Sequence, residues 1–514
     1  MTRFAALVRR LRWIHLAPVL AFAALSAWAF ASPLGAAPDD DYHLVSTWCA
    51  LGGNDECRPG DAEDSRSLDP EFGEVTCYAE HPEESAVCQR DAFDAASPTR
   101  FETDRGNFAG EYPPVYYAVM HLFAGPDIQV SALVMRLVNA ALFVALATAL
   151  SVLLPRVRRT TLLWGWLIAV VPLGMFLIPS NNPSGWAITG VGTAFLALLG
   201  WYETEGRRRW VLGALYIVGV LMAAGARGDA GVYVVGASIV ASILSAVRTR
   251  EWGLRALLLL AGIVISIAFF LSAGQSGVGA IGFTGAEAVT PPSDGSDGAA
   301  GEAPVPLTGV ALAAYNLLSL PHLWTGVWGT WALGWFDTGL PAVVSWAAVS
   351  AFVVVGFAGI GRLDWRKAIS ITGVMLVLIA LPVYVLTVSG TKVGEALQPR
   401  YLLPLILLLC LLLVTMPRGA VLRFTRVQTF LVVAALAGAN LVALQVNIRR
   451  YVTGADQQGL NLDAGAEWWW PAFPVGPMWV WVIGAVAFAG LLAVIWPELR
   501  RADTATGELS RSSR

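Results

Sequence analysis

Apolar residues gather in blocks along most of the chain, and polar residues are confined to the stretches between them. A helix of roughly 20 apolar residues matches the hydrocarbon thickness of a bilayer, so each block is expected to span it. The pattern therefore predicts an all-α polytopic membrane protein. It predicts about twelve transmembrane helices, at residues 13–31, 130–154, 160–179, 184–201, 210–226, 229–247, 254–272, 340–360, 368–388, 399–416, 427–446 and 477–496.

The composition agrees with this class. Of the 514 residues, 56% are hydrophobic and only 14% are charged, whereas soluble domains carry about 25% charged residues. The first block follows a basic start, but its apolar run is longer than the core of a typical signal peptide, so we interpret it as an anchor helix. No Walker sequence, GxGxxG turn or HExxH helix occurs. Their absence argues against a nucleotide-driven pump and a membrane metalloprotease.

The basic residues predict the orientation of the chain. With the N-terminus inside, the inner loops and both ends hold 23 of the 34 Lys and Arg residues, and every inner loop is basic. Because positive residues favour cytoplasmic loops, both termini are expected in the cytoplasm of a bacterium, with the protein in its plasma membrane. The expected parts are residues 1–37 (start and first helix), 38–125 (first outer loop), 126–272 (helices two to seven), 273–339 (second outer loop), 340–499 (helices eight to twelve) and 500–514 (tail).

The first outer loop carries the unusual polar material. Between Pro38 and Tyr112 lie 19 acidic residues against five arginines. Four of the five cysteines are also in this loop. An even number of cysteines in an oxidising compartment predicts two disulfides, with three pairings left open. The four candidates are Cys49, Cys57, Cys77 and Cys88.

The second outer loop has two distinct parts. Residues 273–309 are rich in Gly, Ala, Ser and Pro, a composition typical of a mobile segment. The tryptophan-rich stretch from Leu320 to Pro341 predicts a helix lying on the outer interface. Its Trp324 and Asp337 are candidate substrate contacts because aromatic faces stack on sugars, although an interfacial aromatic belt is the commoner explanation of the tryptophans.

The stretch "PDDDYH" directly after the first helix is the strongest candidate for chemistry. Clustered carboxylates raise the pKa of at least one member, which is how a site obtains a base or a cation-binding pocket. Asp39 or Asp40 is a candidate catalytic base. The alternatives are a divalent-cation site formed by Asp39, Asp40 and His43, and a charged stop marker at the headgroups.

Other polar residues are predicted to gather on the same face. Arg400 and Tyr401 lie at the mouth of a span, and a guanidinium in this position either binds a phosphate or extends to lipid headgroups. Arg136 lies within a span, where a charge needs a partner or an aqueous cavity. The remaining candidate substrate-binding residues are His43, Tyr112, Tyr116, Asn181, Arg227 and Asp229.

Four motifs together resemble a known family. "PDDDYH", "YPPVYY", "GWFDTGLP" and "QPRYLLPL" are similar to motifs of the bacterial membrane family called domain of unknown function twenty-one forty-two. Its first motif usually reads Asp-Glu-Pro-x-His, so Asp39, Asp40 and His43 match it, with Asp40 in place of Glu and Asp41 in place of Pro. The layout is also similar to the GT-C glycosyltransferases. That resemblance implies a first-loop carboxylate as base and a polyprenyl-phosphate sugar as donor.

The sequence thus predicts a glycosyltransferase that moves a sugar from a polyprenyl-phosphate donor to a cell-envelope glycan on the outer face. The expected partners are the lipid bilayer, the polyprenyl-phosphate sugar donor and the glycan acceptor, with no nucleic acid. The alternative in which the aspartates bind a metal adds a divalent cation as cofactor. A transporter or flippase of a lipid-linked sugar and a non-catalytic envelope scaffold are the rival hypotheses. Transporters usually show related halves and polar residues at mid-membrane, whereas the polar residues here lie mostly in outer loops.

Overall fold

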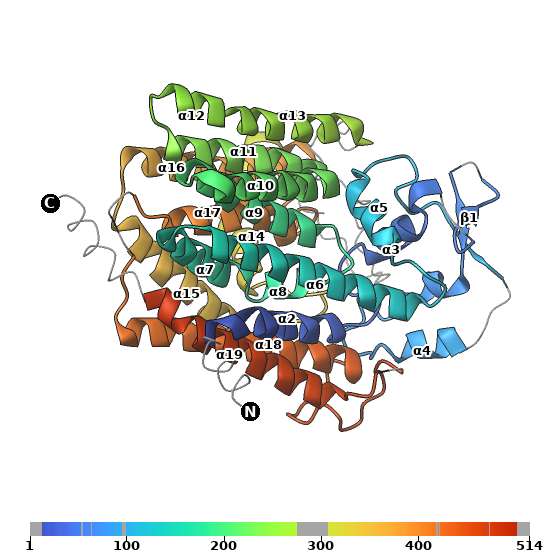
Figure 1. Cartoon of the computed structure of the whole chain (residues 1–514). Coiled ribbons are helices and arrows are strands. Elements are labelled where there is room, and N and C mark those ends of the chain that lie inside the picture. Colours follow the sequence, from blue (N-terminus) through green and yellow to red (C-terminus); the bar gives the residue numbers. More distant parts are fainter. Residues whose placement is uncertain are drawn as a thin grey trace, which may run out of the picture.

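The computed structural model describes residues 13–52, 55–62, 64–94, 99–274, 307–417, 420, 422–471 and 473–500. It is a bundle of long apolar helices with a small mixed domain at one end (Figure 1). The helices of the bundle are α2 (Ala17–Phe30), α6 (Ile128–Leu153), α7 (Arg156–Val170), α8 (Leu173–Leu177), α9 (Ser184–Glu203), α10 (Gly206–Ala226), α11 (Gly228–Ser245), α12 (Arg250–Arg255), α13 (Leu257–Ser272), α14 (Gly309–Thr325), α15 (Ala342–Ile360), α16 (Trp365–Val388), α17 (Pro399–Val414), α18 (Arg426–Val452) and α19 (Pro477–Arg500).

The helices confirm a polytopic membrane protein. Among the described residues, nine helical segments are long and apolar enough to cross a bilayer, and Ile14–Phe30 and Pro399–Val414 are shorter apolar helices. The remaining expected span, residues 160–179, falls on α7 and α8, which are separate helices. Predicted and observed helices therefore agree closely in position, while the count of spans by length alone is lower than twelve.

The centre of the bundle is formed by α9 and α17. Every residue of α17 is buried, because α7, α9, α15 and α16 pack around it. A helix that is apolar on all sides is stable only where neighbours cover all of its faces. By contrast, α13 is mostly exposed and presents large aliphatic side chains outward, as expected of a helix that faces lipid. Arg400 therefore begins the most enclosed helix of the protein.

The end domain is formed by the first loop and contains short elements. These are α3 (Asp40–Trp48), η2 (Ala50–Gly52), β1 (Arg58–Pro59), β2 (Arg66–Leu68), η3 (Pro70–Glu74), α4 (Val87–Asp94), β3 (Phe101–Thr103) and α5 (Val115–His121). The strands form an antiparallel sheet in the order β1-β2-β3, with Ser67 opposite Glu102. In Figure 1 these elements gather at one end of the helices.

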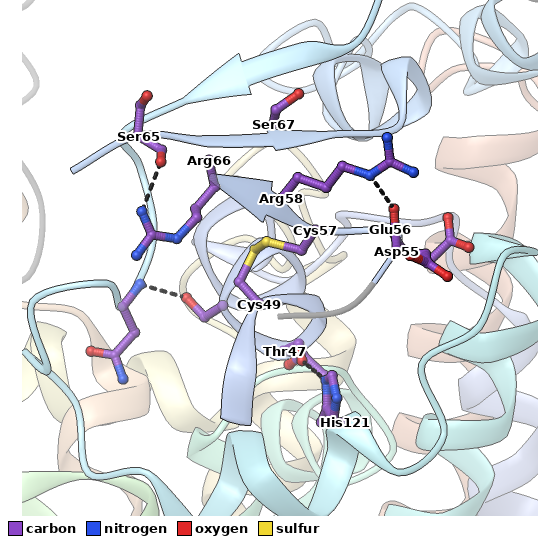
Figure 2. Close-up of a disulfide and its surroundings, with 12 residues drawn as sticks. Thr47, Cys49, Asp55, Glu56, Cys57, Arg58, Ser65, Arg66, Ser67 and His121 are labelled. Carbon is purple, nitrogen blue, oxygen red and sulfur yellow. Dashed lines mark hydrogen bonds between the residues drawn. A yellow bond between two sulfur atoms is a disulfide. The ribbon is translucent and has the colours of Figure 1, made fainter. Parts of the chain in front are cut away.

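Two disulfides stabilise this domain, as predicted. Cys49 pairs with Cys57 and Cys77 pairs with Cys88, so each bond joins two cysteines that follow one another along the loop. Figure 2 shows the first bond between the end of α3 and β1, with His121 of α5 in contact with the carbonyl of Thr47 at 2.9 Å. This bond therefore fixes α3, the helix that begins with the acidic cluster, to the small sheet.

The second outer loop differs from its prediction. Most of the segment expected to be mobile lies outside the described residues. The tryptophan-rich helix was expected at 320–341, but α14 ends at Thr325 and is followed by η5 (Gly326–Trp328) and a turn closed by a bridge between Leu333 and Thr338. Gly329, directly after η5, and Gly334 adopt positive φ angles, which do not continue a helix through the rest of this stretch.

Candidate functional site

Asp39 and Arg400 meet although 361 positions separate them in the sequence. Asp39 immediately precedes α3 with a left-handed backbone (φ 64°, ψ 15°), and its side chain does not cap that helix. Its carboxylate instead accepts a hydrogen bond from Nη2 of Arg400 and lies 3.5 Å from Nη2 of Arg105. Burial raises the pKa of Asp39, but the combined effects of Arg400, His43 and Arg105 outweigh burial and hold this pKa below its ordinary value. The carboxylate is therefore ionised at neutral pH.

The remaining contacts of Arg400 fix its position. Nη1 donates to the carbonyl of Pro38 at 2.5 Å, and Nη2 donates to the Tyr401 hydroxyl at 3.1 Å. Asn182 donates to the same Pro38 carbonyl at 2.8 Å. The Nε of Arg400 is buried, and within the described part of the chain it has no hydrogen-bond partner. One donor of this guanidinium is thus left for another group.

Arg227 and Asp229 form a second buried pair beside the first. Nε and Nη2 of Arg227 donate to the two carboxylate oxygens of Asp229 at 2.9 and 2.8 Å, and Nη1 donates to Ser184. The guanidinium lies 4.5 Å from the centroid of the Tyr401 ring, while that of Arg400 lies 4.9 Å from it. Tyr401 therefore contacts both cations, but Arg227 is already satisfied by its own partners.

Asp40 has a different environment from Asp39. It is fully buried, its Oδ2 accepts from the amide of Ala37 at 3.2 Å, and its Oδ1 has no partner among the described residues. Burial raises the pKa of Asp40 to about 7, against the opposing attraction of Arg136. Two adjacent carboxylates thus differ in ionisation and access, and only Asp39 is reachable from solvent.

Arg136 is a structural clamp in this fold. Its Nε donates to Asn181 at 2.7 Å, and its terminal nitrogens donate to the carbonyls of Ala29, Ser32 and Pro33 at 2.6 to 3.0 Å. These carbonyls lie at the end of α2 and just beyond it, where a helix leaves its last acceptors unpaired. Arg136 and Asn181 were candidate substrate contacts, but their described contacts hold the chain that leads into Asp39.

The aromatic candidates surround His43. Its Nδ1 lies 2.8 Å from the Tyr117 hydroxyl, and the rings of Tyr42 and Tyr112 meet it edge-on. Burial lowers the pKa of His43 to about 3, so its ring is neutral. Tyr116 is buried, and its ring meets that of Trp186 edge-on.

The metal hypothesis does not fit these residues. Asp39 is bound to arginines, Asp40 accepts a backbone amide, and the Nδ1 of His43 faces Tyr117. Across the described ranges no group of three His, Cys, Asp or Glu side chains is placed to hold an ion. We therefore assign no metal-dependent step to the acidic cluster.

Asp337 belongs to a separate buried cluster. Its Oδ2 accepts from Nη2 of Arg450 at 2.8 Å, and that arginine also donates to the carbonyls of Tyr78 and Glu84. Burial raises the pKa of the Tyr78 hydroxyl, which donates to the carbonyl of Leu34. Trp324 is elsewhere, donating to the Leu378 carbonyl of α16.

An apolar cleft opens next to Arg400. Its empty space is about 330 Å³ with the open solvent at its mouth included, and it lies between α8, the stretch after η5 and the start of α17. Its lining includes Leu173, Phe176, Trp331, Phe336, Gln398 and Arg400. Sequence reasoning did not find this cleft, because its walls are short segments joined only by folding. It also missed Arg105 and Arg450; the Arg449-Arg450 doublet on an outer loop was a signal, since it departs from the positive-inside pattern.

The fold and the site together define a class. The chain is a polytopic α-helical membrane protein with a disulfide-bonded loop domain and a buried carboxylate–guanidinium pair where that domain meets the bundle. Within this class, it belongs to the family described as "Predicted membrane protein (DUF2142)", whose model matches residues 22–409. This match confirms the family indicated by the four motifs. A comparison with curated proteins and one with solved structures gave no match.

Proposed function

We propose that this protein is a membrane-embedded glycosyltransferase, which moves a sugar from a polyprenyl-phosphate donor to a cell-envelope acceptor. The observation that carries the proposal is the meeting of Asp39 and Arg400 beside an apolar cleft. A transfer from a lipid phosphate needs a base near the acceptor hydroxyl and a cation near the departing phosphate. A cleft lined by apolar side chains supplies the surroundings that a lipid chain requires.

The chemical step assigns one role to each residue. The acceptor hydroxyl attacks the anomeric carbon, its O–H proton passes to the Asp39 carboxylate, and the bond between that carbon and the phosphate oxygen breaks. The electron pair of this bond remains on the polyprenyl phosphate, whose negative charge Arg400 stabilises. Asp39 is favoured over Asp40 as the base because it is ionised and partly exposed, whereas Asp40 is enclosed.

Two features support an extracytoplasmic site in the bacterial plasma membrane. The distribution of Lys and Arg favours cytoplasmic termini. The two disulfides of the loop domain suit an oxidising compartment, and this domain carries Asp39. Donor and acceptor would then meet on the outer surface.

The test is glycosyl transfer by the purified full-length protein with a panel of radiolabelled polyprenyl-phosphate sugars and envelope glycans. Asp39→Asn is the sharpest variant, because asparagine tolerates the left-handed backbone at this position and keeps an oxygen for Arg400. We expect its turnover to fall by roughly 10²-fold or more, which is typical of a lost general base. Asp41→Asn is the matched control, because Asp41 forms an ion pair with Arg105, as Asp39 does, but takes no part in the ion pair between Asp39 and Arg400.

Full activity of Asp39→Asn would refute the base assignment. Absence of transfer with every donor in the panel would contradict the transferase itself. An assay in detergent micelles distinguishes the transferase from a flippase. Sugar transfer needs no sealed membrane, whereas translocation of a lipid requires a membrane with two separate sides. Movement of the lipid-linked sugar only in sealed vesicles, with no new glycosidic bond, would favour the flippase.

A further inference from the structure

We propose that the cleft beside Arg400 binds the first isoprenoid units of a prenyl monophosphate, with the phosphate at Nε of Arg400. This inference rests on the proposed function only in assuming that the phosphate carries a sugar; the binding of the prenyl phosphate itself is argued from the cleft. The cleft lies between α8, the stretch after η5 and the start of α17, and its walls include Leu173, Phe176, Trp331 and Phe336. Its empty space, about 330 Å³, includes the open solvent at its mouth. The cleft would therefore hold only the segment next to a headgroup, with the rest of the chain in the bilayer.

The polar end of the cleft is built for an anion. Arg400 is only 4% exposed, yet its Nε has no hydrogen-bond partner among the described residues. A buried donor without a partner is costly, and a phosphate oxygen satisfies it with a charge-assisted bond. Because the Nη2 of the same guanidinium holds Asp39, a phosphate on Nε would lie on the side of the proposed base.

Gln398 adds a second polar atom to the same end. Its Oε1 is buried without a hydrogen-bond partner in the described part of the chain. Gln398 lines the cleft together with Arg400. A carbonyl oxygen accepts, so its partner must be a donor such as a hydroxyl of the sugar attached to the phosphate.

The charges around the cleft favour one phosphate over two. Arg227 is engaged with Asp229 and Ser184, and Arg136 is engaged with backbone carbonyls. The cleft therefore offers a single guanidinium donor at its end. A diphosphate would bring a second negative group into mostly apolar walls, where an unpaired charge is strongly disfavoured.

Phe336 marks the mouth of the cleft. It is 44% exposed, lies edge-on to Trp331 and has a φ of 63°, which is unusual for a bulky residue. Its neighbour Asp337 is held by the buried ion pair with Arg450, so the surrounding structure fixes this conformation. Conformations of this kind concentrate at ligand clamps, and here one holds an aromatic ring where an isoprenoid chain would enter.

The test uses a photoreactive analogue of farnesyl phosphate and the full-length protein in lipid nanodiscs. Crosslinks are expected on cleft residues, with competition by farnesyl phosphate. Farnesol and inorganic phosphate should each compete about tenfold less well, because each lacks one half of the recognised chemistry. Farnesyl diphosphate should also compete less well than the monophosphate.

Two variants address the cleft directly. Ala332→Trp fills it, and Phe336→Ala removes the ring at its mouth; each should weaken labelling by about tenfold. Phe357→Ala is the control, because Phe357 is an outward-facing phenylalanine of α15 outside the cleft lining. Phe336→Ala leaves the apolar interior intact, so it keeps the test valid if Ala332→Trp does not fold.

The outcomes separate this inference from the proposed function. Labelling outside the cleft, or equal competition by farnesol, would overturn the cleft assignment. If farnesyl phosphate binds in the cleft but no donor supports transfer, the site stands and the transferase is wrong. If transfer occurs while Ala332→Trp and Phe336→Ala leave the donor KM unchanged, the transferase stands and the cleft assignment is wrong.

Discussion

Replacing Arg136 with methionine should destabilise the protein rather than weaken donor binding. The side chain is 2% exposed and binds three backbone carbonyls at the end of α2 together with Asn181. Methionine has a similar length but no donor. The variant therefore tests whether this intramembrane arginine holds the fold or contacts a substrate.

The magnitude follows from the acceptors that lose their donor. Each buried acceptor left unsatisfied costs about 1–3 kcal/mol, and three carbonyls are affected. Local relaxation reduces the simple sum, so we expect a loss of about 3–5 kcal/mol, the range for breaking a buried charged contact. Arg136→Lys keeps the charge but lacks the planar fork, and its loss should be intermediate.

Equilibrium unfolding in mixed SDS–dodecylmaltoside micelles, followed by tryptophan fluorescence, measures these changes. Arg90→Met is the control, because Arg90 forms an exposed pair with Asp91 and should lose no more than about 1 kcal/mol. A wild-type unfolding free energy for Arg136→Met, combined with weaker binding of farnesyl phosphate, would refute the clamp and restore the phosphate-binding hypothesis.

Two further predictions concern the loop domain. Burial raises the pKa of Asp40 to about 7, so the folded protein loses stability as pH rises from about 4, where this group ionises in the unfolded chain, to about 7. Burial lowers the pKa of His43 to about 3, so the folded protein also loses stability as pH falls below about 6.5, where this group becomes protonated in the unfolded chain. The unfolding free energy, measured against pH, should show that Asp40→Asn becomes more stable relative to the wild type as pH rises, by on the order of 4 kcal/mol at pH 7. A difference in unfolding free energy that does not change with pH would contradict the assignment. Reducing the two disulfides should lower stability by about 3 kcal/mol each, measured by the same unfolding assay, while Cys410→Ser should leave the effect of reductant unchanged, since Cys410 is a free buried thiol.

The spans and the disulfide-bonded loop could be predicted because their causes are local. Apolar blocks, basic inner loops and four cysteines in one loop are all visible along the chain. The end of α14 was predicted wrongly because tryptophans at helical spacing suggested a continuous helix. Gly329 and Gly334 end the regular structure there, and their positive φ angles are not readable from composition.

The partners of the polar residues could not be predicted, because a pattern along the chain does not show which groups folding brings together. Arg227 was expected near a phosphate, yet its partner Asp229 is only two positions away and satisfies it. Asp337 was predicted to contact a substrate, but it pairs with Arg450, which comes 113 positions later. In contrast, the pairing of Asp39 with Arg400 agrees with the expected convergence of acid groups and guanidinium groups.

A single buried segment explains why so many polar side chains gather at this end of the bundle. Residues 31–38 connect α2 to α3 without regular structure, and all of them are buried. Their backbone carbonyls therefore need donors from elsewhere. The side chains that supply them are Arg136, Asn447, Tyr78, Gln89, Trp335, Asn182 and Arg400.

These donors come from at least four separate parts of the chain, and together they fix the path that ends at Asp39. Arg136, which was predicted to contact a substrate, thus helps to position the proposed base. Arg400 differs from the rest, because it holds the Pro38 carbonyl, binds Asp39 and lines the cleft with an Nε that has no hydrogen-bond partner among the described residues. Loss of this residue would therefore disturb both the position of the base and the binding of phosphate. Loss of the cleft wall alone should affect only binding.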